Sequence, residues 1–170
     1  MATLRDLYEA QLRVFARRPE LARGSGHSSV RTIESGVACA VEHEDRTVLV
    51  DLPRDEGGSA TAPDPAQLMR ASLGASLAMG YRVWGERLGV SVERVELDIS
   101  CEYDARGQMG LDDAVPVGWK RVVIQVRVTS RADGADVRRV VEMADRLSPM
   151  LANLSAGIPR VHHLMILRPR

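Results

Sequence analysis

Apolar residues recur at different spacings along the chain, and each spacing predicts a different kind of element. Residues 3–16 place apolar side chains three and four positions apart, which predicts an amphipathic helix. The runs 37–41 and 48–52 are apolar throughout or alternate with polar residues, which is typical of strands. Glu44 and Asp45 lie between the two runs and predict a hairpin turn.

The residues around 64–89 carry signals for both ends of a long helix. Asp64 can cap the N-terminus, Pro65 suits the first helical position, and Gln67 completes a capping box. Gly89 is a good C-terminal stop. The sequence therefore predicts a helix over residues 65–88.

The middle of this helix has no charge between Arg70 and Arg82. Small and apolar residues cover every face there, which predicts a buried helix rather than a surface one. Gly74 and Gly80 each cost about 1 kcal/mol in a helix interior relative to alanine. We therefore expect another backbone or a ligand to approach the helix at these glycines.

The C-terminal half alternates strands and helices. Two long runs of alternating apolar and polar residues predict antiparallel strands. The first places Val95, Leu97, Ile99, Cys101 and Tyr103 on one face, and the second does the same with alternate residues from Val122 to Val128. Residues 137–154 have helical spacing that Pro149 interrupts, so Ser148 is expected to cap a second short helix. A final strand is expected over residues 161–167. The order predicts an α+β fold, with a mostly antiparallel sheet covering a long buried central helix.

Length and composition limit the classes of protein. A chain of 170 residues has the length of one domain. We expect this domain to span residues 25–170, with residues 1–24 as an N-terminal helical extension. The formal net charge of zero argues against nucleic acid or membrane partners. No apolar run is long enough to span a membrane, and Asp6 and Glu9 interrupt any signal peptide. We expect a cytoplasmic protein.

Several segments in order resemble the osmotically inducible protein C and organic hydroperoxide resistance family, OsmC/Ohr. The resemblance covers roughly residues 36–160. It rests on these motifs: Val50-Asp51-Leu52-Pro53 followed by Gly57-Gly58, Asp64 to Leu68, Ala71 to Ala78, Val92 to Asp104, and Ala144 to Met150.

The resemblance implies an intertwined homodimer with active sites at the subunit interface. Family enzymes reduce hydroperoxides with one cysteine on the central helix and a second before a proline in the next helical region. Those positions are Ser76 and Ser148 here, and the position where the family often has a glutamate is Ala66. A serine hydroxyl cannot form the sulfenic acid on which this chemistry depends. We therefore expect a family member without thiol peroxidase activity and without a cofactor.

The family's active-site cavity can persist without its cysteines, because serine is close to cysteine in volume. The expected lining residues are Ser72, Ser76, Met79, Gly80 and Ser148, with Tyr81 or Trp84 nearby. Hydroxyl groups in an apolar cleft are typical of a ligand site. The sequence therefore favours a small apolar ligand bound at the dimer interface, and a filled cavity that binds nothing is the alternative.

Ser76 and the two cysteines offer other kinds of chemistry. Ser76 as a hydrolase nucleophile lacks the strand-turn-helix elbow, so a buried serine bonded to the carbonyl of Ser72 is favoured. Cys39 and Cys101 can form a relocated redox pair for a residual hydroperoxide reductase, although core packing is favoured. Engineered serines are a further alternative, against which Ala66 argues.

The remaining candidates concern metals and partners. The four histidines, His27, His43, His162 and His163, have no metal-ligand spacing, and the last two should point to opposite faces of a strand. We expect structural or solvent roles for them and no metal. The apolar stripe of the N-terminal helix is expected to pack within the dimer, and a foreign partner for it stays open. Three classes of function therefore remain: a non-catalytic binding protein, an enzyme of unfamiliar chemistry, and an interaction module.

Overall fold

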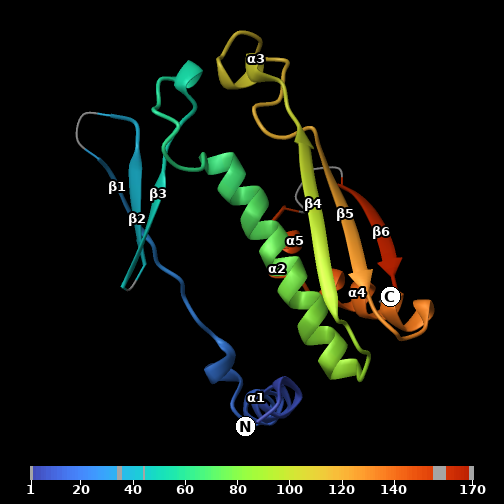
Figure 1. Ribbon diagram of the computed structural model, residues 1–170. Coiled ribbons are helices and arrows are strands. Elements are labelled where there is room, and N and C mark those ends of the chain that lie inside the picture. The colour runs from blue at the N-terminus through green and yellow to red at the C-terminus, as the bar shows by residue number, and fades with distance from the viewer. Residues whose placement is uncertain (1, 34–35, 44, 155–159, 169–170) are drawn as a thin grey trace. The chain divides into compact units, whose positions relative to one another are not determined.

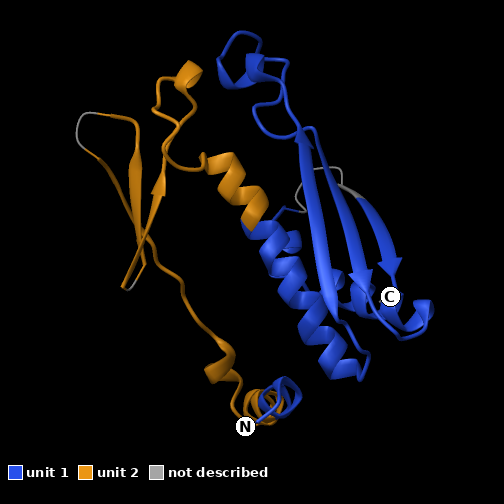
Figure 2. Ribbon diagram, viewed as in Figure 1, with its two compact units in different colours: residues 1–9, 72–170 blue, residues 10–71 orange. Residues whose placement is uncertain are grey.

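The computed structural model describes residues 2–33, 36–43, 45–154 and 160–168. The chain forms two compact units, one of residues 1–9 and 72–170 and the other of residues 10–71 (Figure 2). The predicted boundary at residue 24 is not tested by this division and stays a prediction. None of the helices in the described residues is long and apolar enough to cross a membrane.

The first elements of the chain are short (Figure 1). They are α1 (Leu4–Arg17), η1 (Pro19–Ala22), β1 (Ser29–Thr32), β2 (Cys39–His43), β3 (Arg46–Val50) and η2 (Arg54–Glu56). The predicted N-terminal helix and the two predicted strands are therefore present, each with shifted ends. Part of the predicted hairpin turn, Glu44, lies outside the described residues.

Strands β1, β2 and β3 form an antiparallel sheet in that order. No hydrophobic pattern predicted β1, whose four residues are all exposed. Its pairing with β2 defines it, and an Arg31–Glu42 ion pair of 3.0 Å links the two strands. Within this sheet only Ala40 and Val50 are buried.

The loop after β3 folds around Asp51, which is almost fully buried. Its carboxylate accepts hydrogen bonds from the backbone N–H groups of Leu52, Ser59 and Thr61 and from the Thr61 hydroxyl, at 2.8–3.1 Å. Gly58 lies against this turn, because a Cβ there would collide with the Leu52 carbonyl group. The bonds fix the segment that leads into the central helix.

Helix α2 spans Pro65–Leu88, as predicted. Asp64 Oδ1 accepts from the Gln67 N–H at 2.7 Å, and Gln67 Oε1 accepts from the Asp64 N–H at 2.9 Å, so the capping box is present. Gly89 has a φ of +68°, the left-handed conformation of a helix stop.

Burial of α2 differs from the expectation of a helix covered on every face. Its buried residues are Leu73, Leu77, Tyr81 and Gly85, a single stripe at four-residue spacing. The other faces are partly or fully exposed in the single chain, and Met79 is 63% exposed. The uncharged part of α2 therefore includes faces that are not buried in the single chain.

The two central glycines have ordinary neighbours. A Cβ at Gly74 would meet the Ile99 side chain at 3.3 Å, and one at Gly80 would meet the Ala144 Cβ at 3.7 Å. Within α2 the tightest approach is instead at Gly85, where a Cβ would lie 2.8 Å from Val92. Side chains of neighbouring elements, rather than a backbone, make the approach at Gly74 and Gly80.

The second sheet contains three strands in the order β4, β5, β6. Strand β4 (Arg94–Glu102) pairs antiparallel with β5 (Arg121–Thr129), and the short helix α3 (Ala105–Gln108) lies in the connection. Strand β6 (Arg160–Leu167) pairs parallel with β5. The sheet is thus mixed, while the other three strand pairings of the described residues are antiparallel, in keeping with a mostly antiparallel architecture.

Two helices connect β5 to β6: α4 (Gly134–Arg146) and α5 (Pro149–Leu154). Together with α2 they cover one face of the second sheet (Figure 1). The core between them is mainly aliphatic, and β5 contributes the alternate side chains that its sequence pattern predicted. Its members are Leu73, Leu77, Tyr81, Val92, Val122, Ile124, Val126, Val128, Val137, Val140, Val141, Ala144, Leu151 and Leu154. The prediction that Tyr103 joins this face is wrong, because β4 ends at Glu102 and Tyr103 is 62% exposed.

The first turns of α1 contact the C-terminal part of α2 through a cation–π sandwich. The Arg87 guanidinium carbon lies 2.9 Å from the centre of the Tyr8 ring and 3.6 Å from that of Trp84. Burial lowers the pKa of Arg87 from its ordinary value. Its Nε is buried without a hydrogen-bond partner among the described residues, so the aromatic rings are its main neighbours there.

The α+β class with a long central helix is confirmed.

Candidate functional site

Four of the five predicted pocket residues lie on α2. Ser72, Ser76 and Gly80 follow one another at four-residue spacing, directly beside the buried stripe, and Met79 lies on the same side. Ser72 and Met79 are exposed, whereas Ser76 and Gly80 are partly buried. These residues form a small, partly open strip on α2.

Ser76 does not behave as the sequence analysis favoured. Its hydroxyl makes no side-chain hydrogen bond with any of the described residues, so the expected bond to the Ser72 carbonyl is absent there. The position lies inside a continuous helix, without a nucleophile elbow.

Ser148, the fifth predicted pocket residue, is buried between α4 and α5. Its Oγ accepts a hydrogen bond from the Leu151 N–H at 3.3 Å, and its carbonyl accepts from the Ala152 N–H at 3.0 Å. The predicted capping role before Pro149 is confirmed. That Ser148 and Ser76 face each other across a subunit interface stays a prediction.

Ala66, where the family resemblance would often place a glutamate, is exposed in the first turn of α2. A methyl group cannot accept a proton or a hydrogen bond. The first turn of the helix therefore has no carboxylate of its own to act beside Ser76.

A polar cluster that the sequence analysis missed joins α2, α4 and β6. The Tyr81 hydroxyl donates to Asp145 Oδ1 at 2.8 Å and lies 3.3 Å from His162 Nε2. His162 Nδ1 lies 2.8 Å from Asp145 Oδ2. Tyr81 is completely buried, while the side chains of Asp145 and His162 are 21% and 28% exposed.

In this cluster the Tyr81 hydroxyl donates to one Asp145 oxygen, and the two His162 ring nitrogens lie within hydrogen-bond distance of the phenol and of the other Asp145 oxygen. Burial, followed by the negative charge of Asp145 and the hydrogen bond to it, raises the pKa of Tyr81 far above its ordinary value. The phenol is therefore a fixed hydrogen-bond donor and not an acid. The cluster fits the structural role expected for His162.

The two cysteines lie in different environments. Cys39 is partly buried on β2, and its Sγ lies 3.6 Å from the Val37 carbonyl oxygen. Cys101 is partly buried on β4 and packs against the aliphatic core. Neither forms a disulfide among the described residues, and they belong to different compact units.

No cluster of three or more metal-ligating side chains occurs among the described residues. His27 contacts the Ser29 hydroxyl at 3.2 Å, and His162 belongs to the cluster with Tyr81 and Asp145. In these contacts neither histidine meets a second imidazole or a thiolate.

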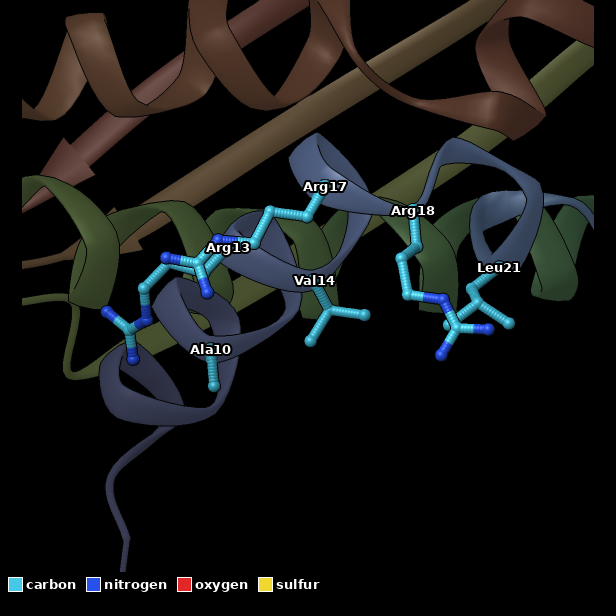
Figure 3. A pocket seen from close by; sticks show the side chains of 6 residues that line it. All are labelled: Ala10, Arg13, Val14, Arg17, Arg18 and Leu21. Atoms are coloured by element: carbon cyan, nitrogen blue, oxygen red, sulfur yellow. The ribbon is translucent and has the colours of Figure 1, made fainter.

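A pocket that the sequence analysis did not predict lies at the C-terminal half of α1 and at η1 (Figure 3). Its volume is about 460 Å³. Aliphatic and basic side chains line it: Ala10, Arg13, Val14, Arg17, Arg18 and Leu21. The arginine-rich end of α1 and the leucine of η1 were the only sequence signals for it.

Solved structures share this fold. An OsmC-like protein from Mycoplasma pneumoniae has a TM-score of 0.70 at 7% identity and covers 85% of this chain and 99% of its own. An organic hydroperoxide resistance protein OsmC from Legionella pneumophila has a TM-score of 0.64 at 17% identity, covering 84% and 99%. The organic hydroperoxide resistance protein OhrB of Bacillus subtilis has a TM-score of 0.55 at 16% identity, covering 82% and 98%.

The sequence itself carries the family relationship. No curated protein matches it. The model of the OsmC-like protein family matches residues 57–162, which include α2, both serine positions and the second sheet up to the start of β6. That match covers more than half of the chain, and the structural relatives share its fold. This chain therefore belongs to the OsmC-like protein family.

Proposed function

We propose that this protein is a homodimeric OsmC-like binding protein that takes a small apolar or amphipathic ligand and lacks thiol peroxidase activity. The observation that carries the proposal is the pair of serines at the two positions where the family resemblance places redox cysteines, Ser76 and Ser148. The proposed location is the cytoplasm.

The loss of peroxidase activity follows from the chemistry of the two side chains. Reduction of a peroxide needs a thiolate that accepts the distal oxygen as sulfenic acid, and a second thiol that then forms a disulfide. Serine supplies neither step. Ala66 removes the carboxylate as well, so three positions of the implied site depart from the enzyme pattern together.

The proposed homodimer rests on apolar surface that a single chain leaves open. The sheet of β1, β2 and β3 buries only two residues, while Val30, Val48 and Leu49 are exposed. Met79 on the uncharged part of α2 is exposed too. A three-stranded sheet needs an apolar face packed against something to be stable. A second copy of the chain would supply that cover.

The proposed ligand site is the strip of Ser72, Ser76, Met79 and Gly80, completed in the dimer by Ser148. Small and apolar side chains leave room for a ligand, and hydroxyl groups can orient it. A relative from Vibrio cholerae, assigned to organic hydroperoxide resistance, holds captopril in one of its active sites. That neighbour has a TM-score of 0.58 at 16% identity and covers 84% of this chain and 93% of its own. An active site of that relative therefore accepts a small organic molecule.

The peroxidase test uses an organic hydroperoxide and a dithiol reductant. We expect no turnover by the natural sequence. The triple variant Ser76→Cys, Ser148→Cys, Ala66→Glu should gain turnover, and Ala66→Glu alone is its control. Turnover by the natural sequence would contradict the proposal.

The ligand test is a thermal-shift screen of small apolar and amphipathic compounds. Ser76→Leu should abolish the shift given by a binding compound, at a folding cost under about 1–3 kcal/mol. Ala71→Leu, an exposed position on another side of α2, is the matched control and should keep the shift. Severe destabilisation by Ser76→Leu, with no compound binding to the natural sequence, would support the filled cavity instead.

Light scattering tests the dimer. A stable monomer near 18.6 kDa at micromolar concentration would refute it.

The second candidate function is a relocated thiol-dependent hydroperoxide reductase. Its support is that Cys39 and Cys101 are both outside disulfides and only partly buried. In the same assay, turnover that Cys39→Ser or Cys101→Ser abolishes would favour it over the binding protein.

A further inference from the structure

Helix α1 leaves its apolar side open to solvent. None of its 14 residues is buried, and only Tyr8, which contacts Arg87, is partly buried. The other large apolar side chains are 37–56% exposed: Leu4, Leu7, Leu12, Val14 and Phe15. A helix of this length is marginal in water without packing of its apolar side. That side of α1 therefore needs cover from outside the single chain.

Helical spacing arranges the charges of α1 around its apolar side. Leu7 and Val14, seven residues apart, share one edge of that side, and Leu12 lies at the opposite edge. The first charged residue past each edge is an arginine, since Arg17 follows Val14 by three residues and Arg5 precedes Leu12 by seven. The acids of the helix come after these arginines, on the polar side: Asp6 and Glu9.

The turn after α1 extends the same pattern. Leu21 of η1 is 48% exposed and lines the same surface hollow as Val14 (Figure 3). Arg17 forms no ion pair with any of the described residues, whereas Arg18 pairs with Glu20 at 3.1 Å. The exposed aliphatic surface thus continues past the helix and keeps an unpaired arginine at its edge.

Positive charge is concentrated in this part of the chain. Residues 1–24 contain five arginines and three acids, while residues 25–170 contain 18 basic and 20 acidic residues. Ion pairs within the segment leave its net charge unchanged. The zero net charge of the whole chain, which argued against a membrane partner, therefore combines a basic segment with a slightly acidic remainder. Such an asymmetry directs the basic segment toward an anionic surface.

A wide apolar side with basic residues at its edges is typical of helices that lie in the interface of a membrane. Arginines at such edges keep their aliphatic stems on apolar surface and extend their charged ends to the headgroups. We propose that α1 and η1 bind an anionic lipid surface. Leu7, Val14 and Leu21 enter the boundary of the acyl chains, and Arg5 and Arg17 contact lipid phosphates. The surface lies outside residues 57–162, which match the family, and is separate from the ligand strip on α2.

The test measures retention of the full-length protein on sedimented vesicles of phosphatidylglycerol and phosphatidylcholine in equal amounts. We expect retention that weakens as salt is added. Vesicles of phosphatidylcholine alone should bind at least about tenfold more weakly, because each basic residue near an anionic surface strengthens binding about fivefold.

Variants locate the surface. Leu7→Ser should weaken retention at least about tenfold, since it removes an apolar side chain from the acyl boundary. Val117→Ser, at a position that is 70% exposed in the connection between β4 and β5, is its matched control. Arg17→Gln should weaken retention on the mixed vesicles about fivefold. Arg139→Gln, at an exposed position of α4, is the control for charge and should leave retention unchanged.

A fluorescence readout covers the case in which Leu7→Ser disturbs α1 itself. Leu7→Trp keeps a large apolar side chain, and its emission should shift to shorter wavelength on the mixed vesicles. Val117→Trp is the control and should show no added shift. The natural tryptophans, Trp84 and Trp119, give the same background in both variants.

Three results would overturn the proposal. They are no retention on the mixed vesicles, equal retention on both kinds of vesicle, and equal loss in Leu7→Ser and Val117→Ser. A second copy of the chain is the rival occupant of this side of α1. If Leu7→Ser turned a dimer into a monomer in light scattering, and the natural sequence was not retained on vesicles, the apolar side would belong to the dimer and the proposal would be wrong.

Discussion

Replacing Tyr81 by phenylalanine should destabilise the protein through the loss of one hydroxyl group. The Tyr81 ring is completely buried in the core, so phenylalanine keeps its apolar contacts. The interactions lost are the hydrogen bond of 2.8 Å to Asp145 and the contact of 3.3 Å with His162. Hydrogen bonds to charged groups contribute roughly 1.5–3 kcal/mol. We expect a value near the lower end, because Asp145 and His162 reach solvent and water can replace part of the bond.

Urea unfolding, followed by circular dichroism at a fixed protein concentration, measures this change in the free energy of unfolding. The matched control is Tyr103→Phe, since Tyr103 is 62% exposed and outside the cluster. The control should change stability by less than about 0.5 kcal/mol. For a chain of this length, each kcal/mol corresponds to a melting temperature shift of about 2–4 °C.

A double-mutant cycle with Asp145→Asn isolates the interaction itself. The effects of Tyr81→Phe and Asp145→Asn should be non-additive by about 0.5–3 kcal/mol, as is usual for contacting groups. Additive effects, or equal effects of Tyr81→Phe and Tyr103→Phe, would refute the reasoning. A pH series provides a second readout. Because the folded-state pKa of Tyr81 is raised, its contribution is complete below its ordinary value of 10 and is lost as the pH rises further.

Three further predictions concern other parts of the chain. Gly58→Ala should destabilise the protein by about 1–3 kcal/mol, because a Cβ would collide with the Leu52 carbonyl group; Gly118→Ala, with open space around it, is the control in thermal unfolding. The N–H of Thr61, then its hydroxyl and the N–H groups of Leu52 and Ser59, hold the pKa of Asp51 below its ordinary value of 3.8. The stability that Asp51 contributes is therefore complete above pH 3.8 and should be lost as the pH falls through the lower folded value, so acid unfolding of Asp51→Asn should lack this component. Arg87→Met should release Tyr8 and the start of α1 from α2, and limited proteolysis should cut the first 24 residues faster than in Arg23→Met; equal rates would contradict the cation–π sandwich.

Local signals determined the elements of the core from the sequence alone. The capping box of Asp64 and Gln67 and the stop at Gly89 act within a few residues, so they fixed both ends of α2. Strict alternation fixed the buried face of β5, since side chains of a strand point alternately to its two faces. Pro149 divided the last helical region, because proline cannot continue the hydrogen bonds of a helix interior.

The candidate site was predictable only in part. The positions of Ser76, Ser148 and Ala66 came from a resemblance in sequence order, and the capping role of Ser148 came from the proline that follows it. Which face of α2 is buried was not predictable, because the uncharged segment has no polar side to mark the exposed face.

Only the tertiary structure brought together residues that are distant in the chain. Tyr81 meets Asp145 across 64 residues and His162 across 81, and no local pattern encodes such a meeting. Strand β1 has four exposed residues, so its pairing with β2 and not its own pattern makes it a strand. The parallel direction of β6 likewise depends on where α4 and α5 return the chain. Hydrophobic periodicity reports which side of an element is buried, whereas partners and strand directions are set by packing between elements.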